Sequence, residues 1–227
     1  FPSIASDAKP SAEIVQETIA GALLQPGFTG RKVVCSLGNG EFQMKNIRLP
    51  RMPPKEMASA IEFEARDRFG FGEREAQYQH LVAGEVRHGN ELKQEIIVFA
   101  TPDSEIEARL NLLAALKLEP VAVDVAPCAV ARSFFRFLRR TEDADAVNIF
   151  LDIGWRGTSI ALTYGTRVSF LKRIEVGGRH FVEAVGKGLS ISTVEAAGLR
   201  MRIMHENAGQ RAGDHESVQG DVLAAVH

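Results

Sequence analysis

The chain has 227 residues, enough for one large or two ordinary domains, and its composition is that of a soluble globular protein. Its formal net charge of −2 and its pI near 6.4 argue against a general nucleic-acid-binding protein, which usually carries a basic face. No apolar run approaches the roughly 20 residues that span a bilayer, and Cys35 and Cys128 have the spacing of neither a metal site nor a redox site.

The first part of the chain predicts one helix and two short strands. The helix begins at Ser11 and stops at Pro26, and the strands cover residues 32–36 and 41–49. Because the first residue is Phe rather than Met, we expect the chain to be a fragment or a processed form.

A helix predicted from Pro54 onward has a core face and one aromatic residue that lies off this face. The core face is formed by residues that recur every four positions, namely Met57, Ile61, Ala65 and Phe69. Phe63 lies nearly opposite Ile61. We therefore expect Phe63 either to contact another part of the chain, which is the commoner outcome, or to bind a partner.

Further strands are predicted over residues 77–83, 92–100 and 121–125, with a helix beginning at Asp103. From Phe42 to the last of these strands, the predicted order is strand, helix, strand, strand, helix, strand. This order indicates a compact α+β unit inserted ahead of the next sheet.

The segment 126–140 predicts a strongly apolar helix with one basic stripe. The stripe consists of Arg132, Arg136, Arg139 and Arg140. A basic helix face can bind an anionic membrane surface, but a solvated face with cations near the helix C-terminus is the more frequent arrangement. The acidic residues 141–145 predict a loop at a subdomain boundary.

Three antiparallel strands with tight turns are predicted over residues 147–171. One face of the first strand carries the apolar residues Val147, Ile149, Leu151 and Ile153. Phe150 makes the opposite face partly apolar, which predicts a central strand. A three-strand meander that leads into a helix from Arg179, with Asp152 at the end of its first strand, is typical of an actin-like or ribonuclease-H-like half-domain.

The turn after the first strand follows the pattern D-x-G-x-x-G-T, formed by Asp152, Gly154, Gly157 and Thr158. Small residues let backbone N–H groups approach phosphate oxygens, and Asp152 could hold a hydrated Mg²⁺ beside them. The pattern is weakly specific. An ordinary hairpin, in which Asp and Thr only stabilise the turn, fits it equally well.

The C-terminal part predicts two helices and a polar tail. Ser190 or Ser192 caps the second helix, which runs through Met204. Residues 207–220 are polar and rich in glycine and predict a mobile loop, and residues 221–227 predict the start of a further helix.

Other chemistry is not indicated by sequence motifs. The chain has no G-x-x-x-x-G-K-[ST] or G-x-G-x-x-G pattern and no H-E-x-x-H pattern. His180 and Glu183 lie one helical turn apart, but a lone pair of this kind is usually found at a surface rather than in a metal site.

Several short segments, taken together, resemble the PilM proteins of type IV pilus assembly. In chain order they are residues 60–65 followed by 69–71, then 116–124, 151–154 and 174–178, and finally 189–192 with Glu195. The likeness extends from about Arg31 to Arg200. PilM proteins belong to the actin-like superfamily and are close to the cell-division protein FtsA.

This resemblance implies an α/β fold, with an actin-like (ribonuclease-H-like) core, an inserted small α+β subdomain and both ends incomplete. Residues 1–40 would belong to the first actin-like half and residues 41–120 to the insert. Residues 121–145 would form the return to the first half and a connecting helix, and residues 146–227 a truncated second half.

The resemblance also implies a partner. PilM proteins are cytoplasmic, bind a short N-terminal peptide of the inner-membrane protein PilN, and often hold ATP between two halves. The implied function is a scaffold, not an enzyme, at the inner face of the inner membrane, with other pilus assembly components as further partners. The expected partner site is Phe63, Phe69 and Phe71, where an extended peptide would lie between the insert and the main domain.

A functional nucleotide site would take ATP and Mg²⁺ at positions that match the family. These positions are Asp152, with Mg²⁺ held through water, and Gly154, Gly157, Thr158, Gly177, Gly178 and Glu195.

The chain departs from the family at Trp155 and Arg156, which stand where small residues are usual, and at Gly198, where a Lys is frequent. It also lacks the earlier D-I-G hairpin and stops before the Gly-Gly loop that meets adenosine. We therefore expect weak or absent ATP binding.

Two other functions compete with the scaffold. One is an ATP-dependent phosphotransferase of the same superfamily, for which no acidic base stands out in the sequence. The other is an FtsA-like cell-division protein, which differs in its partner. The scaffold hypothesis also leaves room for a weak ATPase activity.

Overall fold

The computed structural model describes residues 11–71, 76–88 and 91–213, which form two compact units. The larger unit contains the described residues up to Asp152 together with Thr158–Ile174. The smaller unit contains Ile153–Gly157 and the described residues from Glu175 onward.

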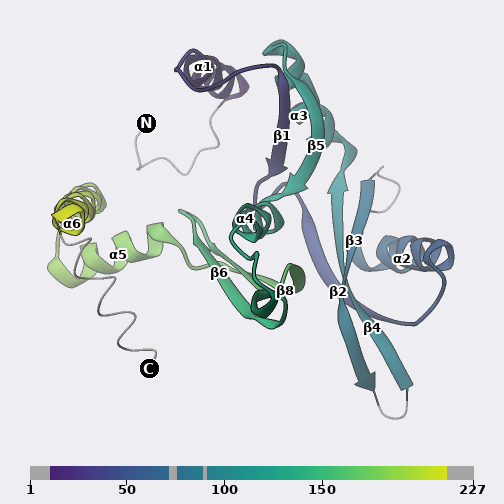
Figure 1. Ribbon diagram of the computed structural model, residues 1–227. Coiled ribbons are helices and arrows are strands. Elements are labelled where there is room, and N and C mark those ends of the chain that lie inside the picture. The colour runs from purple at the N-terminus through teal and green to yellow at the C-terminus, as the bar shows by residue number, and fades with distance from the viewer. Residues whose placement is uncertain (1–10, 72–75, 89–90, 214–227) are drawn as a thin grey trace. The chain divides into compact units, whose positions relative to one another are not determined.

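In the larger unit, two strands that are far apart in the sequence pair in parallel. β1 (Lys32–Leu37) lies beside β5 (Glu119–Val125), with Cys35 opposite Val123 (Figure 1). The helices α1 (Ala12–Leu23) and α3 (Asp103–Ala115) pack against each other, and α3 also contacts β5. β5, the last strand of the predicted α+β order, therefore pairs with β1 and is not part of the sheet of the insert.

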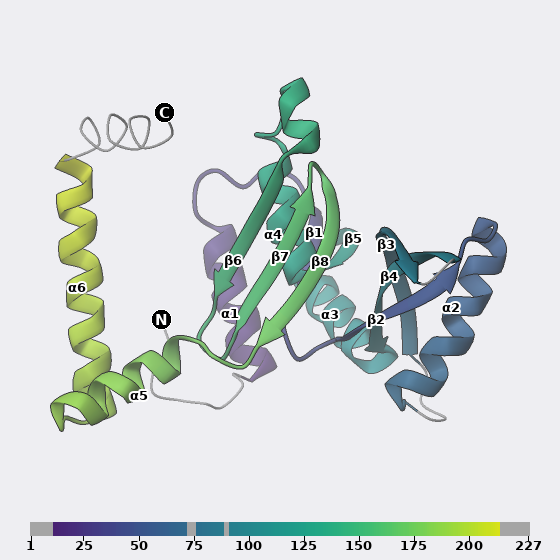
Figure 2. The same cartoon turned by 90° about the horizontal axis from the view of Figure 1, so that it is seen from below.

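The insert is a three-stranded antiparallel sheet covered on one face by a helix. The strands β2 (Gln43–Pro50), β4 (Glu91–Pro102) and β3 (Ala76–His88) lie in the order β2-β4-β3, so β4 is central and β3 is an outer strand. α2 (Pro54–Phe69) lies along this sheet in both views (Figures 1 and 2). Its buried residues are Met57, Ile61, Ala65 and Phe69, which confirms the predicted core face.

The opposite face of the insert sheet packs against α4 (Ala126–Phe135) and a second sheet. This second sheet has the order β6-β7-β8, with β6 (Val147–Ile153), β7 (Thr158–Tyr164) and β8 (Arg167–Ile174) side by side (Figure 2). One core joins the layers through Phe99 of β4, Cys128 of α4 and Leu171 of β8. The larger unit is therefore held together by contacts between segments distant in sequence.

β6 is an outer strand in the part of the chain that the structure describes, so the prediction of a central strand is wrong there. Val147, Ile149 and Leu151 are 61%, 62% and 61% exposed. Phe150 points the other way and packs on Phe134, with ring centroids 5.4 Å apart. The second face of β6 is thus apolar only because of Phe150. The alternating apolar residues Val147, Ile149 and Leu151 lie on a face that the described residues leave exposed.

α4 ends five residues earlier than predicted, and the expected loop at residues 141–145 is a 3-10 helix, η1 (Thr141–Asp145). The backbone N–H of Arg140 donates to Asp143 Oδ2 at 2.7 Å, which starts η1 with a local side-chain bond that competes with continued α-helix. Arg136, Arg139 and Arg140 consequently lie after the helix and share no stripe with Arg132.

The smaller unit contains α5 (Gly178–Leu189) and α6 (Thr193–Gly213). Ser192, rather than Ser190, caps α6, because its hydroxyl accepts a hydrogen bond from Glu195 N at 3.2 Å. The helix extends past Met204, so the loop predicted from residue 207 is wrong as far as Gly213. The rest of that predicted loop and the helix predicted at 221–227 lie outside the described residues.

Candidate functional site

A cavity of about 740 Å³ lies within the larger unit, where the insert meets β5 and α4. Its walls come from β3, from the first turns of α3, and from the junction of β5 with α4. Among the described residues, β3 and β5 each pair on one side only. The cavity therefore lies beside two strand edges that can pair with an added extended chain.

The cavity is lined by apolar and polar side chains together. The apolar residues include Leu37, Leu81, Phe99, Ile106 and Val123, and the uncharged polar ones include Gln77, Gln79 and Thr101. Apolar walls with a few placed polar groups are typical of a site that binds a ligand or a peptide.

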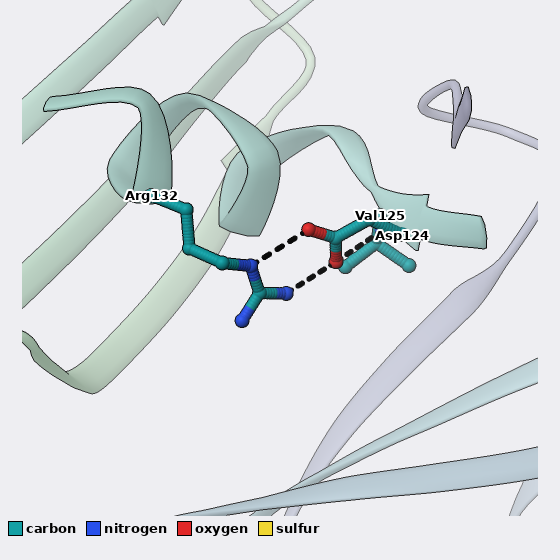
Figure 3. A network of polar contacts seen from close by, with 3 residues as sticks. All are labelled: Asp124, Val125 and Arg132. Carbon is teal, nitrogen blue, oxygen red and sulfur yellow. Dashed lines mark hydrogen bonds and ion pairs between the residues drawn. The ribbon is translucent and has the colours of Figure 1, made fainter. Parts of the chain in front are cut away.

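An ion pair closes one wall of the cavity, at the junction of β5 and α4. Arg132 Nε donates to Asp124 Oδ2 at 2.8 Å, and Arg132 Nη2 donates to Oδ1 (Figure 3). The backbone N–H of Val125 also donates to Oδ1, at 2.8 Å. Hydrogen bonding to Asp124 raises the pKa of Arg132, so the pair stays charged and is electrically neutral as a whole.

The thiol of Cys128 lies on the cavity lining but is unsuited to nucleophilic chemistry. The side chain is fully buried. Burial, together with the nearby Asp124 charge, raises the pKa of Cys128 to about 11. Because the thiolate is the reactive form, this cysteine is a packing residue of α4.

The aromatic residues predicted to bind the partner do not form one surface. Phe69 is 5% exposed and belongs to the core of the insert, and Phe71 packs on it with ring centroids 6.3 Å apart. The physical reason is Gly70, whose left-handed backbone (φ 66°) ends α2 and turns the chain back on itself. Phe63 is 78% exposed. Phe69 is therefore a core residue of the insert, and its role in partner binding stays a prediction.

Four of the predicted nucleotide-binding glycines do come together, in the smaller unit, but they contact one another. Gly178 N donates to Gly154 O at 2.9 Å, and Gly154 N donates to Gly157 O at 3.0 Å. Arg179 N donates to Trp155 O at 3.0 Å. The first amide groups of α5, which would serve a phosphate, are thus used by the turn 154–157.

The lack of a side chain at Gly177 is explained by the same packing. A Cβ there would lie 2.5 Å from Gly157 N, 2.6 Å from Gly154 O and 2.7 Å from Trp155 O. At Gly178 a Cβ would lie 2.8 Å from Arg200 Nη1 and 3.1 Å from the Trp155 ring. The protein's own atoms therefore fill the space next to both glycines, and weak or absent ATP binding stays a prediction.

The remaining predicted nucleotide residues take no part in those backbone hydrogen bonds. Glu195 accepts hydrogen bonds from Ser192 N at 2.9 Å and from the Ser192 hydroxyl at 2.7 Å, which lowers the pKa of Glu195. Its carboxylate is therefore part of the cap of α6. Asp152 is exposed near the end of β6, and Thr158 is buried at the start of β7. No group of three potential metal ligands occurs among the described residues.

Sequence reasoning missed the residues that line the cavity. The sequence places Asp124 only in a strand, and it suggests a surface stripe for Arg132. A usable signal was an acid at a strand end followed eight residues later by an arginine in the next helix, since such a pair can clamp a strand–helix junction. Asp103 and Glu107 share one face of α3 at a spacing of four, which marked them as neighbours.

Comparisons with known proteins give one family match. The model of the family described as type IV pilus assembly protein PilM matches residues 3–205. No curated protein sequence matches the chain.

Among solved structures, the chain is similar to one described as the PilM-PilN type IV pilus biogenesis complex, with 23% identity and a TM-score of 0.71. The match covers 99% of this chain and 66% of that one, just under two thirds of its length. A weaker likeness, with 12% identity and a TM-score of 0.46, is to the cytoplasmic domain of EpsL, an inner-membrane component of the type II secretion system of Vibrio cholerae. It covers 73% of this chain and 57% of that one.

Proposed function

Because the chain belongs to the PilM family of type IV pilus assembly proteins, we propose that it is a scaffold that captures the cytoplasmic tail of a PilN-like inner-membrane protein. Its fold is the actin-like α/β fold of the family, with a small α+β insert. The single observation that carries the proposal is the cavity of about 740 Å³ beside edges of β3 and β5 that have no strand partner in the described part of the chain. An extended tail can add backbone hydrogen bonds to such an edge and place alternate side chains in the cavity.

The proposal of a scaffold rather than an ATP-dependent phosphotransferase is supported by the glycine corner of the smaller unit, in which Gly177 and Gly178 pack on the turn 154–157. There, the amides of Gly178 and Arg179 donate to the turn 154–157. A phosphoryl-transfer enzyme needs such donors for the transferred phosphate. We propose that the chain works at the inner face of the inner membrane through its partner. None of the described helices is long and apolar enough to span a bilayer.

The test is titration of the chain with a synthetic peptide of the N-terminal tail of the PilN-like protein from the same organism. Val123→Arg places a long side chain in the cavity and should weaken binding by about 2 kcal/mol or more, as for a central interface position. Val34→Arg is the matched control. It makes the same substitution at an exposed position on the neighbouring strand, and Val34 lies opposite Ala122, on the other face of the pair.

A third variant separates the cavity from the exposed aromatic. Phe63→Ala should leave both peptide affinity and melting temperature near those of the wild type, because Phe63 lies on the outer face of α2. If Phe63→Ala weakens binding while Val123→Arg does not, the tail binds at α2 and the cavity assignment is wrong.

A further inference from the structure

We infer that the cavity selects a tail with a basic side chain beside its apolar anchors, and that Asp103 and Glu107 of α3 receive this basic group. The inference rests on the proposed function, because it specifies the chemistry of the peptide that the cavity takes.

The charges on the cavity lining lead to this preference. Its charged side chains are Asp103, Glu107, Asp124 and Arg132. Asp124 and Arg132 neutralise each other through a bidentate ion pair. His80 also lines the cavity and adds no negative charge. The lining therefore carries an excess of two carboxylates, both from α3.

These two carboxylates face the cavity without a cationic partner among the described residues. Asp103 Oδ1 accepts a hydrogen bond from the neutral Gln77 side chain at 2.9 Å, which orients the carboxylate and leaves its charge in place. The positive end of the α3 dipole offsets part of the Asp103 charge. Glu107 lies one turn further along the helix, where this effect is weaker.

The position of Ile106 between the two carboxylates explains why an apolar neighbour is required as well. Ile106, Asp103 and Glu107 lie on one face of α3 and all line the cavity. A Lys or Arg side chain can lay its methylene stem along Ile106 and bring its charged end to the carboxylates. An acidic tail residue would instead meet like charge, which costs affinity and slows association.

The experiment uses the full chain and the same tail peptide, in its natural form and with each Lys or Arg replaced by Gln. The double variant Asp103→Asn with Glu107→Gln should weaken natural-tail binding by about tenfold or more, or about 1.4 kcal/mol. It should also flatten the salt dependence of the affinity. Asn retains an oxygen that accepts the Gln77 bond, so the fold should persist, which circular dichroism checks. The matched control Glu105→Gln lies in the same part of α3 but does not line the cavity, and should stay within about twofold.

The outcomes separate this inference from the proposed function. In one outcome the natural tail binds the wild-type chain and Val123→Arg weakens this binding, but neither the double variant nor the Gln substitutions in the peptide change the affinity. The charge preference is then wrong and the proposed function stands. A natural tail that binds without containing any basic residue overturns the inference in the same way. A wild-type chain that binds no tail peptide overturns both.

Discussion

Asp124 and Arg132 form a two-pronged ion pair across the junction of β5 and α4, eight residues apart in the sequence. The Asp124 side chain is mostly buried, whereas Arg132 remains half exposed. The pair fixes the direction in which α4 leaves β5 and forms one wall of the cavity. It therefore links the stability of the larger unit to the shape of the candidate site.

Breaking this pair should destabilise the larger unit. We expect Arg132→Met to lower the free energy of unfolding by about 1–2 kcal/mol, because Asp124 is then left buried without its charged donor. Arg132→Lys should recover only part of this loss, since an ammonium group cannot reproduce the planar fork. Urea unfolding followed by circular dichroism measures both. A lysine variant as stable as the wild type would show that fork geometry contributes nothing.

Substitution by Ala should change the stability of the smaller unit in opposite directions at Gly177 and at Gly198. Gly177→Ala should destabilise the smaller unit by about 2 kcal/mol or more, because its Cβ would overlap the rigid backbone of the turn 154–157. Gly198→Ala should stabilise α6 by about 0.5–1 kcal/mol, because Gly198 lies within the helix and a Cβ added there would meet nothing within 4 Å beyond its chain neighbours and the backbone of its own helix. Thermal melts of the two variants give the comparison. Equal effects would contradict the close packing at Gly177.

Nucleotide binding should be weak or absent. The amides at the start of α5 already donate to the turn 154–157, and Trp155 and Arg200 lie against Gly178. Isothermal titration with ATP and Mg²⁺ should give no submicromolar binding, alongside a nucleotide-binding actin-like protein as the positive control. A submicromolar dissociation constant would refute this interpretation of the corner.

Cys128 should make stability depend on alkaline pH. Its folded pKa is raised to about 11, whereas an unfolded thiol has a pKa of about 8.5. The neutral thiol's contribution is fully present below the lower value and is lost as pH rises through the upper one, at up to about 1.4 kcal/mol per pH unit. The free energy of unfolding should thus fall more steeply over this range in the wild type than in Cys128→Ala. Parallel curves for the two proteins would contradict the raised pKa.

The arginines after α4 should not bind lipid. Arg140 pairs with Glu142 at 3.3 Å, and Arg139 Nε donates to Arg136 O at 2.6 Å, so they do not form one basic face. Each basic residue near an anionic surface contributes only about 1 kcal/mol. Sedimentation with vesicles rich in phosphatidylserine should leave the wild type in the supernatant. Salt-sensitive co-sedimentation that disappears when Arg136, Arg139 and Arg140 become Ala would show the opposite.

Local patterns predicted the elements of the fold well. The four-residue spacing of Met57, Ile61, Ala65 and Phe69 predicted the buried face of α2, and all four are buried. Helix periodicity and strand alternation are properties of neighbouring residues, so the sequence displays them directly. The pairing of β1 with β5 depends on segments about 87 residues apart, and no local signal carries it. The early end of α4 was hidden because the chain after Phe135 forms tight turns, in which Phe137 N donates to Phe134 O and Leu138 N donates to Phe135 O.

The candidate site was less predictable, for a physical reason. Gly154, Gly157, Gly177 and Gly178 fit a phosphate cradle and a tightly packed turn equally well, because both need backbone atoms without a Cβ nearby. The family resemblance named a peptide partner, and Phe69 and Phe71 were assigned to its site because they flank a glycine turn that could approach a neighbouring element. The cavity instead combines residues of β3, α3, β5 and α4, which only the tertiary structure brings together.

The uncovered edge of β6 also affects how the protein must be handled. Its exposed row of Val147, Ile149 and Leu151 lies beside an edge without a strand partner among the described residues. Neither a lysine nor a proline interrupts this strand, although such residues commonly guard natural edges against pairing between molecules. With a formal net charge of only −2, long-range repulsion adds little protection. Concentrated solutions of the chain should therefore aggregate through β6, and Ile149→Lys should raise its solubility without disturbing the core around Phe150.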